Sequence, residues 1–285
     1  MNYDRLFSFV VFADYLNFTR AAEALHITQP ALHGQIRKLS DEVGAALYRR
    51  KGRALVITAE GRKLAAFGRE VQVRGRDVLA ELRGETPCGP VVLASGQGAF
   101  LYLLGPAIKR YPKKRWPLRL LAMSGPETVD AVRDARADVG VAVLHAVPGD
   151  LQCQELRSVG QRVMLPRGHR LARRRHLTAS DLDGETIVVA PEASPHRLML
   201  AQALATAGAR WTVAVEATGW EVMIQFARYG LGITVVNDFC PVPRGFVGVP
   251  FGGVPKVSYS VITRRIASSD PRDMLVQMIL DAAGT

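Results

Sequence analysis

Residues 18–32 decide the fold of the N-terminal region and read Phe18-Thr19-Arg20-Ala21-Ala22-Glu23-Ala24-Leu25-His26-Ile27-Thr28-Gln29-Pro30-Ala31-Leu32. Thr19 is expected to cap a short helix whose alanines permit close helix packing. The pair His26-Ile27 would form a tight connection. Thr28 would then cap a second helix with Pro30 in its first turn, where the missing N–H costs little. Two short helices joined by a tight turn indicate a helix-turn-helix.

The second of these helices carries two unlike faces. Its inward positions recur at helical spacing as Leu32, Ile36 and Leu39, and Gly44 is expected to end it. The outward positions near its start are Thr28, Gln29, His33 and Arg37. Polar side chains at a helix N-terminus can reach base edges while the first N–H groups point at phosphate, as a recognition helix requires. The alternative is that Gln29 is an ordinary solvated polar residue.

A basic hairpin is predicted soon after the second helix. The segment 47–58 reads as two short strands around a turn with Gly52 at its tip, and residues 49–53 include four cations. Such a hairpin reads as the wing of a winged helix-turn-helix and suits contacts with phosphate or the minor groove. A solvated basic hairpin without a partner is the alternative interpretation.

The whole pattern resembles the signature of LysR-type transcriptional regulators. It consists of the run 18–32 followed by Ile36, Leu39, Gly44, Leu47-Tyr48, Arg50, Thr58 and Gly61. The resemblance implies that the major groove is faced by Thr28, Gln29, Pro30 and His33, with Arg37 near the DNA backbone and Arg50 and Arg53 on the wing. Serine is common in the family where this chain has His33, so the resemblance also implies an unusual base preference.

A long linker helix is predicted over residues 59–85, with Thr58 as its cap. Its apolar and small residues recur at alternating spacings of four and three as Leu64, Gly68, Val71, Gly75, Val78 and Leu82. The two glycines permit a partner helix to approach closely. Since helix-turn-helix proteins commonly bind paired half-sites as dimers, a homodimer or homotetramer is expected. The alternative is that this helix packs only on its own chain.

The remaining residues predict an α/β domain, because short apolar runs alternate with helical stretches. Two similar halves predict two lobes, residues 90–162 with 265–285 and residues 163–264. The chain as a whole is thus expected to be an α/β multidomain protein: a winged helix-turn-helix over 1–58, the linker helix, and a bilobed effector-binding domain over 90–285. Residues 138–142 and 230–233 resemble the family's periplasmic-binding-protein-like effector domain most clearly.

A small-molecule effector is expected between the two lobes. Ligands of open α/β sheets bind outside the carboxyl ends of the strands. The candidate effector contacts lie in the loops and helix starts there: Ser95, Gln97, Ser124, His145, His196 and Thr218. Helix N-termini at this edge favour an anionic ligand. The alternative for the hydroxyl groups is that they cap helices and bind no ligand.

Composition limits the possible partners and the compartment. The chain has 37 basic and 26 acidic residues, a charge that attracts polyanions, but most of the excess lies beyond residue 85 and does not place a DNA site. Three widely spaced cysteines lack metal-ligand spacing, so neither a metal nor another cofactor is expected. No signal peptide or membrane span is recognised, which predicts a cytoplasmic protein. The resemblance to LysR-type regulators implies a bacterial protein bound to promoter or operator DNA, with RNA polymerase as a further partner.

An enzyme is not expected. The segment 95–98 follows a predicted strand, but it fits neither a nucleophile elbow nor a phosphate-binding loop, and its Gly-x-Gly lacks the third glycine of a dinucleotide fingerprint. The rival interpretation is a solute-binding protein without DNA function, because its two lobes would look the same. Such a protein would need export, which the first sixty residues do not direct.

Overall fold

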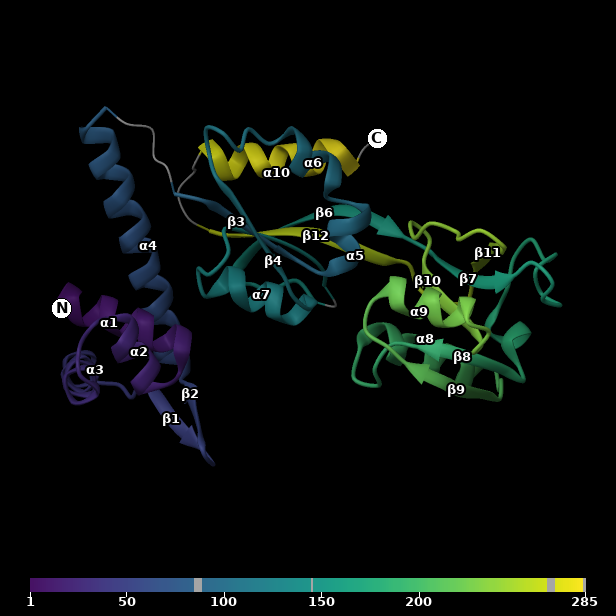
Figure 1. The fold of residues 1–285 in the computed structure, drawn as a ribbon, viewed down its shortest axis with the longest axis horizontal. Coiled ribbons are helices and arrows are strands. Elements are labelled where there is room, and N and C mark those ends of the chain that lie inside the picture. Colours follow the sequence, from purple (N-terminus) through teal and green to yellow (C-terminus); the bar gives the residue numbers. More distant parts are fainter. Residues whose placement is uncertain (85–88, 145, 266–269, 284–285) are drawn as a thin grey trace.

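The computed structural model describes residues 1–84, 89–144, 146–265 and 270–283. Figure 1 shows a small helical unit with a long helix on one side of the molecule and two α/β lobes on the other. The predicted architecture, a winged helix-turn-helix, a linker helix and a bilobed α/β domain, is confirmed.

The N-terminal unit packs three helices and a hairpin around one apolar core. Its elements are α1 (Tyr3–Tyr15), α2 (Phe18–Ala24), α3 (Gln29–Val43), β1 (Tyr48–Lys51) and β2 (Ala54–Ile57). The predicted inner face of α3, Leu32, Ile36 and Leu39, is fully buried. Thr28 caps α3 and Gly44 ends it in the left-handed conformation (φ +71°), both as predicted. The cap of α2 differs, because the side chain of Asn17, not Thr19, accepts from the Arg20 N–H at 3.1 Å.

The linker helix α4 (Ala59–Leu82) begins at the predicted cap, where the Thr58 hydroxyl accepts from the Gly61 N–H at 3.0 Å. Its two seam glycines have different surroundings. A Cβ atom at Gly68 would lie 2.5 Å from Val10 and 3.2 Å from Leu6, so here α4 packs closely on α1 of its own chain. A Cβ atom at Gly75 would meet nothing within 4 Å. The predicted seam of α4 therefore packs on α1 of the same chain at Gly68 and is exposed at Gly75.

The first lobe (lobe I) is a five-stranded sheet covered by helices. Its elements are β3 (Val91–Ser95), α5 (Gln97–Tyr102), α6 (Gly105–Arg110), β4 (Leu118–Ala122), α7 (Gly125–Arg133), β5 (Val139–Val143), β6 (Leu151–Val159), β12 (Val257–Arg264) and α10 (Asp270–Ala283). The strand order is β4-β3-β5-β12-β6, in which β3, β4 and β5 run parallel and β12 runs antiparallel to β5 and β6.

The second lobe (lobe II) repeats that plan. Its elements are β7 (Gln161–Pro166), a 3-10 turn η1 (Ala179–Leu182), β8 (Glu185–Val189), α8 (Pro195–Thr206), β9 (Trp211–Glu216), α9 (Trp220–Arg228), β10 (Ile233–Asn237) and β11 (Phe246–Phe251). The order β9-β8-β10-β7-β11 matches that of the first sheet strand for strand. The two similar halves seen in the sequence are therefore two copies of one topology.

The predicted lobe boundary at residue 264 is wrong. Strand β12 was assigned to the second lobe, but it pairs with β5 and β6 in the first. The reason is topological: the antiparallel strand β12 completes the first sheet, as β7 completes the second. The chain therefore crosses between the lobes twice, at Gly160 between β6 and β7 and again between β11 and β12. Strands β6 and β11 were not predicted, because β6 is largely polar and the apolar residues of β11 are interrupted by Gly248 and Pro250.

Candidate DNA-binding surface and inter-lobe site

The start of α3 presents its polar side chains to solvent. Thr28 accepts the Ala31 N–H at 3.3 Å and so fixes the first turn, with Pro30 beside it. The predicted contact residues are all exposed: Thr28, Gln29, Pro30, His33 and Arg37. Because the opposite face of α3 is fully buried, this exposed face has a defined orientation on the domain. The helix can therefore offer its N-terminal turn to a DNA groove.

An aromatic cluster joins the recognition helix to the hairpin. The rings of Phe12 and Phe18 lie 4.4 Å apart between centroids, and both lie within 5.4 Å of the Tyr48 ring in β1. The His33 ring on α3 lies 5.2 Å from Phe18. Sequence analysis did not single out this cluster, although the three aromatic residues were visible. It holds the orientation of His33 relative to the hairpin.

The hairpin is the predicted wing. Strands β1 and β2 pair in antiparallel register from Tyr48–Ile57 to Lys51–Ala54, and Gly52 at the tip adopts a positive φ of 61°. The cations Arg49, Arg50, Lys51 and Arg53 are exposed, and within the described part of the chain no carboxylate pairs with them. Unpaired cations on a two-stranded projection are available for phosphate groups.

The two lobes meet where the helices α5 and α9 begin. A Cβ atom at Gly98 would lie 2.8 Å from the Trp220 ring, and one at Gly219 would lie 3.1 Å from the Gln97 amide oxygen. The Tyr102 hydroxyl of lobe I donates to the Glu221 carboxylate of lobe II. This region, where the lobes meet around Gln97 and Trp220, is called the inter-lobe site below.

His196 at the start of α8 borders the inter-lobe site. Its ring lies 4.6 Å from the Trp220 ring, edge to face, and its Nε2 lies 3.0 Å from the Gln161 Oε1 atom. The His196 Nδ1 and Gln161 Nε2 atoms are buried and have no hydrogen-bond partner among the described residues. Buried polar atoms of this kind normally have a partner, so a ligand or a water molecule at this site would satisfy them.

His196 gives the first testable prediction. Burial lowers the pKa of its imidazole from 6.5 to about 4. The folded protein thus binds fewer protons than the unfolded chain between these values, and the stability from neutral His196 is full above pH 6.5 and lost as pH falls toward 4. When the pH falls from 7.5 to 5, we expect the free energy of unfolding to decrease by about 2 kcal/mol because of His196.

Urea unfolding at pH 7.5 and pH 5 measures this loss. In His196→Gln the difference between the two pH values should shrink by that amount, whereas His33→Gln, at an exposed histidine, should behave as wild type. An equal pH dependence in wild type and His196→Gln would show that His196 is solvated.

The other predicted effector residues are placed differently. Gln97 and Thr218 are exposed beside the inter-lobe site. Ser95 is fully buried and donates to the Val141 carbonyl at 2.6 Å, while Ser124 caps α7 through a reciprocal bond pattern with Glu127. Both hydroxyls therefore already have partners within the chain. His145 lies outside the described residues.

Residues missed by sequence analysis are central to the contact between the lobes. They are Tyr102, Gln161, Trp220, Glu221, Asn237 and Tyr259. Asn237 of β10 donates to the Tyr259 hydroxyl of β12 at 3.1 Å, which adds a buried bond between the lobes. None of them belongs to a motif, and only the packing of two similar lobes brings them together. Trp220 directly after Gly219 at a helix start was the one visible signal.

The described residues show no metal-binding cluster of His, Cys, Asp and Glu side chains. Cys153 and Cys240 are free thiols, and burial raises the pKa of Cys240 to about 12, so this thiol stays protonated and unreactive. Cys88 lies outside the described residues. Within the described ranges, no helix combines the length and the apolar character that crossing a membrane requires.

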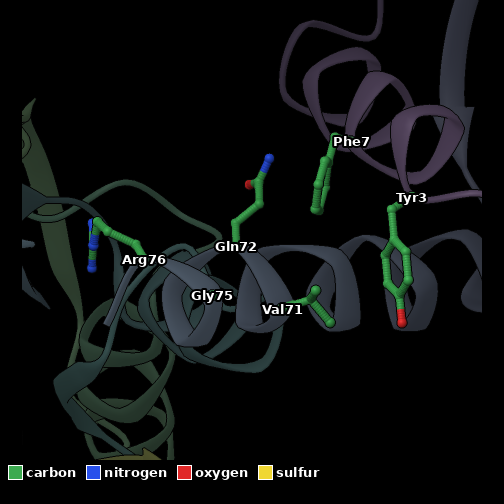
Figure 2. A pocket seen from close by; sticks show the side chains of 6 residues that line it. All are labelled: Tyr3, Phe7, Val71, Gln72, Gly75 and Arg76. Atoms are coloured by element: carbon green, nitrogen blue, oxygen red, sulfur yellow. The ribbon is translucent and has the colours of Figure 1, made fainter. Parts of the chain in front are cut away.

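A groove lies between α1 and α4 on the solvent side of the linker helix. It has a volume of about 340 Å³ and is lined by Tyr3, Phe7, Val71, Gln72, Gly75 and Arg76. Figure 2 shows Phe7 and Tyr3 on α1 facing the α4 turns that carry Val71 and Gly75. Farther along α4, Leu79 and Leu82 are 54% and 79% exposed. An apolar strip thus continues from the groove toward the end of the helix.

Comparison with known proteins agrees with this arrangement. Residues 3–62 match the model of the bacterial regulatory helix-turn-helix proteins of the lysR family, and residues 84–282 match the LysR substrate binding domain. The transcriptional regulator AlsR of Bacillus subtilis is 29% identical over 241 residues, which cover 80% of this chain and 78% of AlsR. Such relatives are regulators and not solute-binding proteins, so the solute-binding alternative is wrong.

Solved structures share the fold over nearly the whole chain. A full-length variant of OxyR from Pseudomonas aeruginosa superposes with a TM-score of 0.73 at 22% identity, covering 99% of this chain and 94% of that one. Full-length CbnR, solved with its target DNA, gives a TM-score of 0.56 at 19% identity, covering 99% of this chain and all of CbnR. The wing, the recognition helix and the paired lobes are thus parts of one regulator, and the chain belongs to the LysR family of DNA-binding transcriptional regulators.

Proposed function

We propose that this regulator recognises its operator through Thr28, Gln29, Pro30 and His33 in the major groove. Arg37 and the wing residues Arg50 and Arg53 would neutralise phosphate groups. The observation that carries the proposal is the exposed first turn of α3 together with unpaired wing cations on the same small domain. Base edges supply sequence information, whereas phosphate contacts set register and add affinity that depends on salt.

Fluorescence anisotropy tests this assignment directly. The probe is the DNA upstream of the protein's own gene, titrated over a salt series beside random DNA of equal length. Preferential binding that weakens steeply with salt is the expected result. Equal affinity for both DNAs at every salt concentration would contradict sequence-specific recognition.

We propose further that the protein assembles as a homodimer, or as a homotetramer built from two dimers, through the groove between α1 and α4. The groove is apolar, and the exposed side chains of Leu79 and Leu82 extend it along α4. The partner would be the same face of a second copy, because a two-fold axis through this helix places two recognition helices on paired half-sites.

The second testable prediction concerns Gly75. Gly75→Arg places a charge in the groove, and its Cβ atom meets nothing within 4 Å, so the side chain leaves the helix without strain at its base. We expect self-association to weaken by more than about 10-fold, which corresponds to about 1.4 kcal/mol, while the melting temperature of the diluted protein stays unchanged. Sedimentation velocity over a concentration series measures the first effect, and calorimetry measures the second.

Two further glycine variants provide the controls. Gly105→Arg adds the same charge at a helix position that is equally free of neighbours, and it should leave self-association intact. Gly68→Ala should instead lower the melting temperature, because its Cβ would press on Val10. A dimer that survives Gly75→Arg would move the interface away from this groove.

We propose that a small-molecule effector, with an anion as the first class to test, binds at the inter-lobe site. Its contacts would come from the exposed Gln97 and Thr218 and from the unpaired polar atoms of His196 and Gln161. Ser95 and Ser124 would take part after exchanging their present partners, and His145 completes the proposed set. A thermal-shift screen of wild type and Gln161→Leu against a panel of carboxylic acids tests the site. A stabilising acid whose effect persists in Gln161→Leu would count against it.

The biological setting follows from these assignments. We infer that the protein acts in the cytoplasm at a promoter, where RNA polymerase is a further partner, and that it catalyses no reaction. Its output would be a change in transcription when the effector is bound. A ligand must bind one conformation better than the other to produce such a change, so a compound that binds without altering the DNA footprint would not be the effector.

A further inference from the structure

Arg69 in the middle of α4 bridges three parts of the chain. Its Nη2 atom lies 2.5 Å from the Asp14 carboxylate at the end of α1, and its Nη1 atom donates to the Asp134 carbonyl just after α7 at 2.5 Å. Only 12% of the Arg69 side chain is exposed. A nearly buried guanidinium with two fixed acceptors holds a defined geometry, because its donors are planar and rigid.

A second bridge lies beside the first, with the arginine on lobe I and its partner on α4. Arg264 at the end of β12 donates through Nη1 to the carbonyls of Val132 and Ala137 at 2.9 and 2.7 Å. Its Nε atom forms an ion pair with the Glu70 carboxylate on α4 at 3.1 Å, without hydrogen-bond geometry, and its Nη2 lies 3.5 Å from Asp138. The Arg264 side chain is only 11% exposed.

These two bridges form one contact between the DNA-binding part and lobe I, here called the linker junction: Arg69, Glu70, Asp134 and Arg264. Arg69 on α4 contacts the turn after α7 directly, because its guanidinium donates to the Asp134 carbonyl. Its neighbour Glu70 contacts the same turn through Arg264, which donates to two carbonyls there. The two adjacent contacts resist both sliding and rotation of α4 relative to that turn.

Helix α7 connects the linker junction to the edge of the first sheet that also leads into Gln97, since β3 and β4 end side by side at Ser95 and Ala122. It starts at Ser124, directly after strand β4, and ends at the Asp134 turn. Its nine residues make a rod of about 13 Å, because an α-helix rises about 1.5 Å per residue. Both ends are fixed, by a capping box at Ser124 and by Arg69 and Arg264 at the other end. A tilt of α7 at its start must therefore displace the junction or break it.

We propose that Arg69, Glu70 and Arg264 are positioning residues that transmit movements of lobe I to the DNA-binding unit through the last turn of α7. This inference rests on the proposed function, since it needs both an effector near the start of α7 and DNA at α3. The junction sets the orientation of α4, and with it the separation of recognition helices in a dimer. It acts without touching effector or DNA.

The test uses the full-length protein with Arg69→Leu and Glu70→Ala, which remove each bridge from the α4 side and leave the core of lobe I intact. Asp14→Ala is the matched control for Arg69, because it breaks the bond to α1 and keeps the bond to Asp134. Lys63→Leu, at an exposed position of the same helix, controls for changes to α4 itself. Hydrogen exchange and DNase footprints on the upstream DNA are compared for all four variants and wild type.

We expect the amides of residues 134–137 to exchange at least about 10-fold faster in Arg69→Leu and Glu70→Ala than in either control. Affinity for the upstream DNA should change by less than about 3-fold, while the footprint changes in length or in hypersensitive positions. Unchanged exchange rates would show that the contacts from α4 do not stabilise this turn and would overturn the proposal. Faster exchange with the wild-type footprint would overturn its role in transmission.

The same experiment separates this inference from the proposed function. If wild type does not prefer its upstream DNA to random DNA, sequence-specific recognition fails. The exchange comparison then still decides whether the junction exists, because it needs neither DNA nor effector.

Discussion

Replacing Arg49, Arg50 and Arg53 together by glutamine should weaken binding to specific and random DNA alike by about 100-fold at 0.15 M salt. The three side chains are exposed on the wing, and no carboxylate in the described structure pairs with them, so their charge is available for phosphate. Each phosphate contact contributes about −0.9 to the slope of log affinity against log salt. The magnitude of this negative slope should therefore decrease by about 3 per subunit, as measured by anisotropy over a salt series.

A matched loss of charge distinguishes wing contacts from a general effect of net charge. Arg167, Arg173 and Arg175 lie in an exposed loop of lobe II, and their replacement by glutamine removes the same three charges. That variant should keep nearly the full salt slope. A similar fall in both triple variants would mean that the wing has no special role.

Gln29→Ala should lower affinity for the operator by about 10- to 100-fold and leave affinity for random DNA unchanged. Gln29 is the first residue of α3, exposed beside the Thr28 cap, where a side-chain amide can pair with a base edge. A good bidentate base contact contributes about 1–3 kcal/mol of discrimination. Competition between labelled operator DNA and unlabelled random DNA measures the ratio of the two affinities.

The control for Gln29 is Gln154→Ala, at an exposed position on strand β6. It should bind operator DNA as wild type does, and circular dichroism should show that α3 is intact in both proteins. Loss of affinity for random DNA in Gln29→Ala, equal to its loss for operator DNA, would assign Gln29 to the backbone instead of the bases.

Local signals predicted the DNA-binding unit well. The Thr28 cap, the Gly44 terminus and the turn at Gly52 are encoded by residues next to the feature that they form, so they could be identified from the sequence. Asn17 was overlooked as the cap of α2 because Thr19, two residues later, has the same capping chemistry. Two capping residues this close together differ only in their backbone conformation, which cannot be seen in the sequence.

Long-range pairing was harder to predict. Strand β12 lies far along the chain from β5 and β6, and its apolar pattern would fit either lobe. The contacts of Gly68 with Val10 and of Gly98 with Trp220 likewise depend on packing between distant segments. For Ser95 and Ser124 the position beyond a strand was visible, but their partners inside the chain were not.

The two crossings between the lobes have a mechanical consequence. Both ends of the effector domain lie in the first lobe, since it contains the domain's first element, β3, and its last two, β12 and α10. The second lobe is an insertion held at two nearby points, and its only covalent route to α4 passes through the first. The whole second lobe, with its loops and ligand contacts, can therefore be exchanged without changing how the first lobe is joined to the DNA-binding unit.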